Sequence, residues 1–275
     1  MIKVFNALLI AVLFYYFVGA VAIRYFIDDL VFIGAPEQET NESIRLFSRV
    51  GKTETLIRGY GLNNSKKCVI FFPGRTGGIP RYEKALFESV IGRGIPLYAL
   101  SYPGYEGAKG KSSFSNIIET TSSAVSLIAI KQHCNISESV FVGRSLGASI
   151  ALETAAIYSP KGLILDSVGI SLDSVIKDTL SKKRVFYLLS FLPIQNLLLF
   201  NQDLVSSIKK AQPSRVYIYQ GELDEMAPYH ALIKVLKGLP NTKIVEVPHA
   251  THKNAFKMAG NQYFENIVYL INSGS

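Results

Sequence analysis

The chain has 275 residues, 48% of them hydrophobic and 18% charged, and a formal net charge of +8. This length favours one domain over two, and the apolar composition excludes a disordered protein. Acidic residues are interspersed with the basic ones, and there is no nucleic-acid motif and no interleaved basic and aromatic stripe. We therefore expect no nucleic-acid partner, although the basic excess suits an anionic membrane surface.

An apolar segment lies close to the amino terminus. Residues 4–23 include no charged side chain, and a run of about 20 apolar residues is what a helix needs to cross a bilayer. The segment predicts a retained transmembrane signal-anchor over residues 1–26, followed by a linker over residues 27–42. The alternative is a cleaved signal peptide with the small residues 19–22 at the cleavage site, but the run is longer than such segments usually are.

The charges beside this segment indicate its orientation. Lys3 and the terminal amine precede the span, and Arg24 follows it with Asp28 and Asp29 close behind. Acidic residues count little in the positive-inside rule, so the balance favours an amino terminus in the cytoplasm. We therefore expect a single-pass membrane protein whose folded body lies on the non-cytoplasmic side.

Strand and helix patterns alternate through the rest of the chain. Short apolar runs, several of them apolar on both faces, predict strands of a parallel sheet covered by helices. The expected strands, after a pair around residue 51, are 68–72, 95–101, 139–143, 162–166, 216–220 and 243–247. The expected helices are 82–91, 114–131, 146–158 and 254–271. The pattern predicts an α/β fold with a mostly parallel central sheet flanked by helices.

This alternation breaks once, between about residues 171 and 212. The stretch 186–200 is very apolar and has no strand signal, and Pro193 in its middle leaves each half too short for a second membrane span. We predict a small helical lid insertion within a domain of residues 43–272. Its apolar side either packs on the sheet or faces a hydrophobic substrate or the bilayer.

The two cysteines, Cys68 and Cys134, lie at the start of an apolar strand and at the end of a helical stretch. Both are expected to be small buried hydrophobic residues, which would say nothing about the redox compartment. There is no Cys-X-X-Cys motif and no cluster of cysteine and histidine, so we expect no metal and no cofactor.

A Gly-X-Ser-X-Gly pattern, from Gly143 to Gly147, lies between a predicted strand and a predicted helix. In such a nucleophile elbow, side chains at the glycine positions would collide with neighbouring backbone, and the serine is held in a strained turn. The N–H of Leu146, at the start of the helix, points toward a developing oxyanion. Ser145 is therefore the candidate nucleophile. The alternative is a turn of small residues that contains a serine by chance.

A serine nucleophile needs a base and a carboxylate that orients the base. Among the acids that follow Ser145, Asp224 is preferred to Glu222 and Glu225, because its side chain is shorter and its spacing from the strand end is better. Asp166 also ends a strand. We expect it to pack or hydrogen-bond at the rim, and its use as the acid is the less favoured alternative.

Two histidines follow the last predicted strand. We select His252, which lies nearer the start of the final helix, as the general base, and we assign His249 a supporting or surface position. Acid and base then both fall on loops at the carboxyl ends of strands, where open α/β sheets place their sites.

The second oxyanion donor is expected in the loop FFPGRTGG, residues 71–78, after the first buried strand. Its glycines allow backbone N–H groups to approach a charged oxygen closely. We predict that the backbone N–H groups of Arg75 and Leu146 form the oxyanion hole.

Together these stretches resemble the α/β-hydrolase superfamily, most closely its membrane-anchored branch with a GRSLG elbow, the α/β-hydrolase domain-containing proteins. The similarity rests on FFPGRTGG, SYPGYEGAKGKSS, GRSLGASIALETA, GELDEMAP and ATHKNAF, in this order, and on the amino-terminal anchor. It implies that Ser145 is the nucleophile, Asp224 the acid and His252 the base, with oxyanion-hole amides from Arg75 and Leu146.

The oxyanion loop departs from this resemblance. The family's loop usually reads His-Gly-Asn, and this chain has Pro73-Gly74-Arg75. The backbone donor is retained, because the chemistry uses an N–H group. For the added guanidinium of Arg75, our hypothesis is that it reaches an anionic group of the substrate.

The expected function is a membrane-anchored serine hydrolase that cleaves an ester, thioester or similar acyl bond through an acyl-enzyme on Ser145. Its substrate is expected to be an acyl-containing small molecule or a lipid-like compound. The alternatives are an acyltransferase or a peptidase on the same residues, and a non-catalytic binding protein on the same fold.

Overall fold

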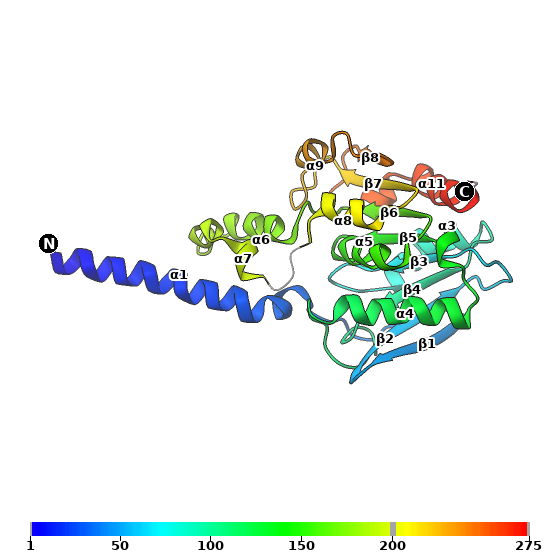
Figure 1. The fold of residues 1–275 in the computed structure, drawn as a ribbon, viewed down its shortest axis with the longest axis horizontal. Coiled ribbons are helices and arrows are strands. Elements are labelled where there is room, and N and C mark those ends of the chain that lie inside the picture. Colours follow the sequence, from blue (N-terminus) through cyan, green and yellow to red (C-terminus); the bar gives the residue numbers. More distant parts are fainter. Residues whose placement is uncertain (1, 199–201, 274–275) are drawn as a thin grey trace.

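A twisted sheet with helices on both faces forms the body of the protein, and one long helix projects from it (Figure 1). The computed structural model describes residues 2–198 and 202–273. Its sheet has eight strands in the order β1-β2-β4-β3-β5-β6-β7-β8. The pairs β1–β2 and β2–β4 are antiparallel, and the other neighbours are parallel. The mostly parallel α/β sheet predicted from the sequence is thus confirmed.

Each strand expected from the sequence is present, with its ends within two residues of the prediction. The central strands are buried at every residue, whereas the edge strand β1 alternates between exposed and more buried positions, as its single covered face requires. The strands are β1 (Ile44–Val50), β2 (Thr53–Tyr60), β3 (Val69–Phe72), β4 (Leu97–Ser101), β5 (Val140–Arg144), β6 (Gly162–Asp166), β7 (Arg215–Gly221) and β8 (Thr242–Val247).

Helices cover the two faces with two separate apolar clusters. One face carries α4 (Ile117–Lys131), α5 (Leu146–Tyr158), α8 (Leu204–Ala211) and α9 (Tyr229–Leu236). The other carries α2 (Pro80–Tyr82), the π-helical turn η1 (Glu83–Phe87), α3 (Glu88–Ile91), α10 (Ala255–Met258) and α11 (Asn261–Asn272). A short 3-10 turn, η2 (Ile136–Glu138), precedes β5. The expected last helix is divided into α10 and α11 at Gly260, whose φ of +58° lies outside the helical region.

The register of the parallel strands brings their carboxyl ends to one edge of the sheet. Phe72 at the end of β3 pairs with Gly143, and Arg144 at the end of β5 pairs with Asp166 at the end of β6. The loops that follow these strands therefore meet above this edge, which is where open α/β sheets bind their ligands.

The long helix α1 (Ile2–Val31) has a mean hydropathy of 2.2 in its most apolar window, and its length and composition suffice to cross a membrane. Its last turns belong to the body, because Ile27 is buried and the following Phe32 lies 5.0 Å from the ring of Phe114. Asp28 also accepts a hydrogen bond from the Phe114 backbone N–H. The stretch predicted as a linker, residues 27–42, thus begins as packed helix, since it carries apolar side chains that the body buries.

The predicted helical insertion leaves the sheet after β6. It contains α6 (Leu172–Ser181), the 3-10 turn η3 (Tyr187–Phe191), α7 (Ile194–Leu197) and α8. An antiparallel bridge joins Ser171, just before α6, to Asp203, just before α8, and α8 then packs on α5. Residues 199–201 of the insertion lie outside the described residues.

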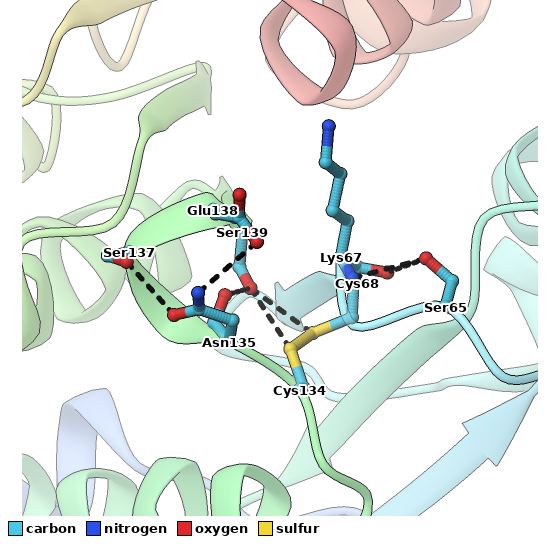
Figure 2. Close-up of a disulfide and its surroundings, with 8 residues drawn as sticks. All are labelled: Ser65, Lys67, Cys68, Cys134, Asn135, Ser137, Glu138 and Ser139. Carbon is cyan, nitrogen blue, oxygen red and sulfur yellow. Dashed lines mark hydrogen bonds between the residues drawn. A yellow bond between two sulfur atoms is a disulfide. The ribbon is translucent and has the colours of Figure 1, made fainter. Parts of the chain in front are cut away.

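Cys68 and Cys134 are joined by a disulfide across 66 residues of chain (Figure 2). Both are buried, as expected, but the interpretation of two separate apolar side chains is wrong. Their proximity comes from the pairing of β3 with β5, since the N–H of Val140 bonds to the Cys68 carbonyl and Cys134 lies just before η2. Sequence spacing alone does not give that distance. A stable disulfide is typical of an oxidising compartment.

Removal of this disulfide should destabilise the fold. The bridge restricts the unfolded chain over a long loop, so Cys68→Ala together with Cys134→Ala should lower the free energy of unfolding by about 2–4 kcal/mol. Denaturant titration of the full chain in detergent measures this, and addition of a reductant to the wild-type protein should reproduce the shift. An unchanged unfolding midpoint, with two free thiols in the non-reduced wild-type protein, would contradict it.

Candidate active site

The elbow between β5 and α5 has the geometry that its glycines permit. Ser145 has φ +51° and ψ −122°, a strained conformation for a residue with a side chain. A Cβ on Gly143 would lie 2.5 Å from the carbonyl oxygen of Gly147, and one on Gly147 would overlap the carbonyl oxygen of Phe72. Both glycines are therefore needed to seat α5 against the end of β3, which is the steric reason expected from the sequence.

His252 and Asp224 form a hydrogen-bonded line with Ser145. The Oγ of Ser145 lies 2.8 Å from Nε2 of His252. The Nδ1 of His252 lies 2.9 Å from Oδ2 and 3.1 Å from Oδ1 of Asp224. With Nδ1–H donating to the carboxylate, Nε2 is left to accept the proton of the serine hydroxyl. The structure thus brings together the three side chains nominated from the sequence.

Three further donors hold the Asp224 carboxylate. The backbone N–H groups of Met226 and Ala227 each donate to Oδ1 at 2.9 Å, and the Gln220 side-chain amide donates to Oδ2 at 2.7 Å. Gln220 is fully buried at the end of β7 and was not identified from the sequence. The only signal was one polar residue after the apolar run VYIY, four positions before the acid.

The other candidates for the acid and the base do not take part in the hydrogen bonds between Ser145, His252 and Asp224. Glu225 is 85% exposed, and His249 is 83% exposed with its Nδ1 3.7 Å from Glu222. His249 is thus a surface residue, one of the two positions expected for it. Among the described residues, no group of three or more His, Cys, Asp or Glu side chains is placed to hold a metal ion.

A buried ion pair lies directly under the elbow. The Nε of Arg144 is 3.7 Å from Oδ2 of Asp166, and the Arg144 guanidinium also donates to the backbone carbonyl of His252. Burial raises the pKa of the Asp166 carboxyl to about 6, although the charge of Arg144 and a hydrogen bond from Ser167 oppose this shift. Asp166 therefore hydrogen-bonds and packs near the rim, as expected, and Arg144 links it to the loop that carries the histidine.

The loop after β3 lies beside the elbow, because Phe72 pairs with Gly143. Tyr105 Oη donates to the Arg75 carbonyl at 2.9 Å, which fixes one side of this loop. The Arg75 guanidinium donates to the carbonyl of Leu30 at 3.2 Å, at the carboxyl end of α1 where a positive charge is favourable. The N–H of Leu146 is the first of α5 and so has no acceptor within the helix.

A small cavity of about 70 Å³ opens beside Ser145 and His252. Its walls are mainly apolar and come from α4, α5 and the insertion, for example Ile117, Ile150, Leu172 and Val175. Gln202 also lines it. This side chain is 3% exposed, and its Nε2 has no hydrogen-bond partner among the described residues. A buried amide donor without an acceptor is costly, so a bound ligand that supplies an acceptor would relieve that cost.

No protein-family model matches the chain, and no curated protein matches its sequence. Solved structures do match its fold. The Pyrococcus furiosus esterase Pf2001 is 13% identical, with a TM-score of 0.65 over 86% of this chain and 95% of that one. Est1E from Butyrivibrio proteoclasticus, in a structure with ferulic acid bound, is 18% identical, with a TM-score of 0.67 over 83% and 100%. An α/β-hydrolase from Vibrio vulnificus is 15% identical, with a TM-score of 0.65 over 84% and 81%.

These likenesses, taken with the strand order, establish that the chain has the α/β-hydrolase fold. At such low identity they speak for the architecture alone. The activity depends on the residues at the carboxyl edge of the sheet.

The raised pKa of Asp166 predicts a pH dependence of stability. Because the folded-state pKa of about 6 exceeds the ordinary value of 3.8, protonation favours the folded state. This contribution is full below pH 4 and is lost as the pH rises through about 6. Lowering the pH from 7.5 to 4.5 should therefore stabilise the wild-type protein relative to Asp166→Asn, by about 2 kcal/mol. Thermal unfolding of both proteins across this range measures the difference, and parallel curves would refute it.

Proposed function

We propose that the protein is a membrane-anchored serine hydrolase that cleaves an ester, thioester or similar acyl bond. The observation that carries this proposal is the contact of Ser145 Oγ with His252 Nε2 at 2.8 Å, with Asp224 on the opposite nitrogen of the ring. The strained elbow conformation adds support, since strain of this kind is maintained where it positions a reacting group.

In the proposed reaction, His252 Nε2 takes the hydroxyl proton as Ser145 Oγ bonds to the acyl carbon. The negative charge that forms on the carbonyl oxygen is stabilised by the N–H groups of Leu146 and Arg75. The tetrahedral intermediate then breaks its bond to the leaving group, which receives the proton from His252. Water, deprotonated by the same nitrogen, attacks the acyl-enzyme and releases the acid, and the proton returns to Ser145.

Asp224 keeps the imidazole in the required tautomer and stabilises the imidazolium that forms. Its two backbone donors and Gln220 hold the carboxylate in place throughout. Arg144 helps to hold the histidine in place, since its guanidinium donates a hydrogen bond to the backbone carbonyl of His252.

The cavity supports an acyl group of limited size. A volume of about 70 Å³ is well below that of pockets that enclose a drug-sized ligand. We infer that a short acyl group occupies the cavity and that an oxygen within this group accepts a hydrogen bond from Gln202 Nε2. The remainder of the substrate, which is lipid-like or otherwise amphiphilic, lies outside toward the insertion.

We place the catalytic body on the non-cytoplasmic side of a membrane. The Cys68–Cys134 disulfide supports this, because stable disulfides are rare in the reducing cytosol. Retention of the anchor is supported by the contacts of α1. Peptidase cleavage within residues 19–22 would separate Tyr15 from its partner, the Val185 carbonyl.

Labelling by a fluorophosphonate probe tests the activity. The full chain in detergent should react at Ser145, and Ser145→Ala should abolish the labelling. His252→Gln should lower the rate of ester hydrolysis at least about 10³-fold, because the serine loses its base. Ser137→Ala, on an exposed turn, is the matched control and should label like the wild-type protein. Folded wild-type protein that fails to react would refute the hydrolase and favour a binding protein.

Substitution of Gln202 tests the proposed acyl recognition. Butyrate and methoxyacetate esters have nearly the same shape, but only methoxyacetate carries an acceptor in the acyl chain. Gln202→Leu should lower the ratio of kcat/KM for methoxyacetate over butyrate by about tenfold, since one hydrogen bond to a buried donor is lost. An unchanged ratio in an active variant would exclude this role for Gln202.

A further inference from the structure

The tip of the helical insertion exposes a dense group of large apolar side chains. We call residues 185–191 the apolar tip. Its exposed members are between 48% and 74% accessible, and they are Val185, Phe186, Tyr187, Leu188 and Phe191. Isolated exposed apolar residues need no explanation, but a contiguous group of this kind marks an interaction surface.

The apolar tip is held against α1. Tyr15 Oη donates to the Val185 carbonyl at 2.7 Å. Leu189, the buried residue of the tip, sits on Gly19, where a Cβ would overlap its side chain. Figure 1 shows α6 and α7 extending from the body along α1, with the amino-terminal part of α1 continuing beyond them. The body therefore covers α1 as far as Tyr15.

The length of α1 left uncovered is too short to span a bilayer. Residues 2–14 are all exposed. Thirteen helical residues rise about 20 Å, at about 1.5 Å each, whereas the hydrocarbon core of a bilayer is about 30 Å thick. If α1 crosses the membrane, about 10 Å of the core must therefore surround the part of α1 that carries the insertion.

We propose that the apolar tip is a second membrane-contacting element, which enters the leaflet beside α1 to a depth of about 10 Å. The proposal rests on the membrane anchor of the proposed function, but not on the hydrolase chemistry. The occupant of this surface is the lipid itself, because the tip is continuous with the apolar surface of α1.

The charges beside the tip fit this position. Lys183 and Arg184 precede it directly and are exposed. Their long side chains can extend back toward the headgroups while their stems stay in apolar surroundings, and anionic lipids would favour this.

The helix that leads to the apolar tip also lines the cavity beside Ser145. Leu172 and Val175 of α6 form part of the cavity wall, and the same helix leads to the tip. One insertion thus contacts the lipid and shapes the entrance to Ser145. This arrangement suits an acyl amphiphile dissolved in that leaflet.

The chain contains no tryptophan, so a single introduced tryptophan reports its own surroundings. Phe191→Trp, Phe14→Trp and Phe47→Trp are prepared in the full chain and reconstituted in phosphatidylcholine vesicles with or without bromine on the acyl chains. Phe14 lies on the uncovered part of α1, and Phe47 is the matched control, an exposed apolar residue on β1 that is 43% accessible. Circular dichroism and thermal unfolding show whether each variant has folded.

Bromine should quench the emission of Phe191→Trp and Phe14→Trp at least about twofold and leave that of Phe47→Trp unchanged. Quenching at position 14 but not at position 191 would overturn the proposal and leave the anchor intact. Quenching at neither position would remove the anchor and the proposal together, whereas fluorophosphonate labelling of Ser145 would still decide the hydrolase separately. Equal quenching at position 47 would also overturn the proposal, because the whole body would then be adsorbed.

Discussion

The close approach of α5 to the end of β3 is the constraint on which the site depends. It exists only because Gly147 has no side chain to meet the carbonyl oxygen of Phe72. That contact sets the helix axis, forces Ser145 into its strained conformation and places the first N–H of α5 beside the loop after β3. The partners of the serine lie on the loops that follow β7 and β8, and side chains at strand ends hold them, with Gln220 bonded to Asp224 and Arg144 to the His252 carbonyl.

Much of this arrangement could be predicted from the sequence, because the strand pattern is repetitive and the elbow motif is local. Buried parallel strands are continuous apolar runs, which is why the strands were located to within two residues. The elbow is a pattern of five residues, and the order of Asp224 and His252 after it limited the choice of partners. Asp224 stood out from Glu222 and Glu225 by spacing and length, and it is the one of the three with a buried side chain.

What the sequence did not reveal depends on contacts between distant segments. The pairing of β3 with β5 brings Cys68 to Cys134, and no spacing rule contains that information. Gln220 gained its role only when the loop after β7 folded back over it. The sequence predicts a linker over residues 27–42 where the structure has packed helix at first, because the partners of Ile27 and Phe32 lie in a different part of the chain. The sequence points to Arg75 for its charge alone, and in the structure its guanidinium donates to the Leu30 carbonyl, which ties the loop beside the elbow to α1.

The disulfide closes a segment of chain that carries only some of the residues around the site. The segment that it closes, between Cys68 and Cys134, carries the loop with Arg75 and the cavity wall at Ile117, whereas Ser145, Asp224 and His252 all lie beyond it. A proteolytic cut anywhere within that segment therefore leaves a single covalent molecule, with both fragments still attached to the sheet. A cut between Ser145 and His252 would leave two fragments with no covalent link between them. Exposed turns such as the one at Gly110 can therefore be nicked in a protease-rich compartment without dissociation of the protein.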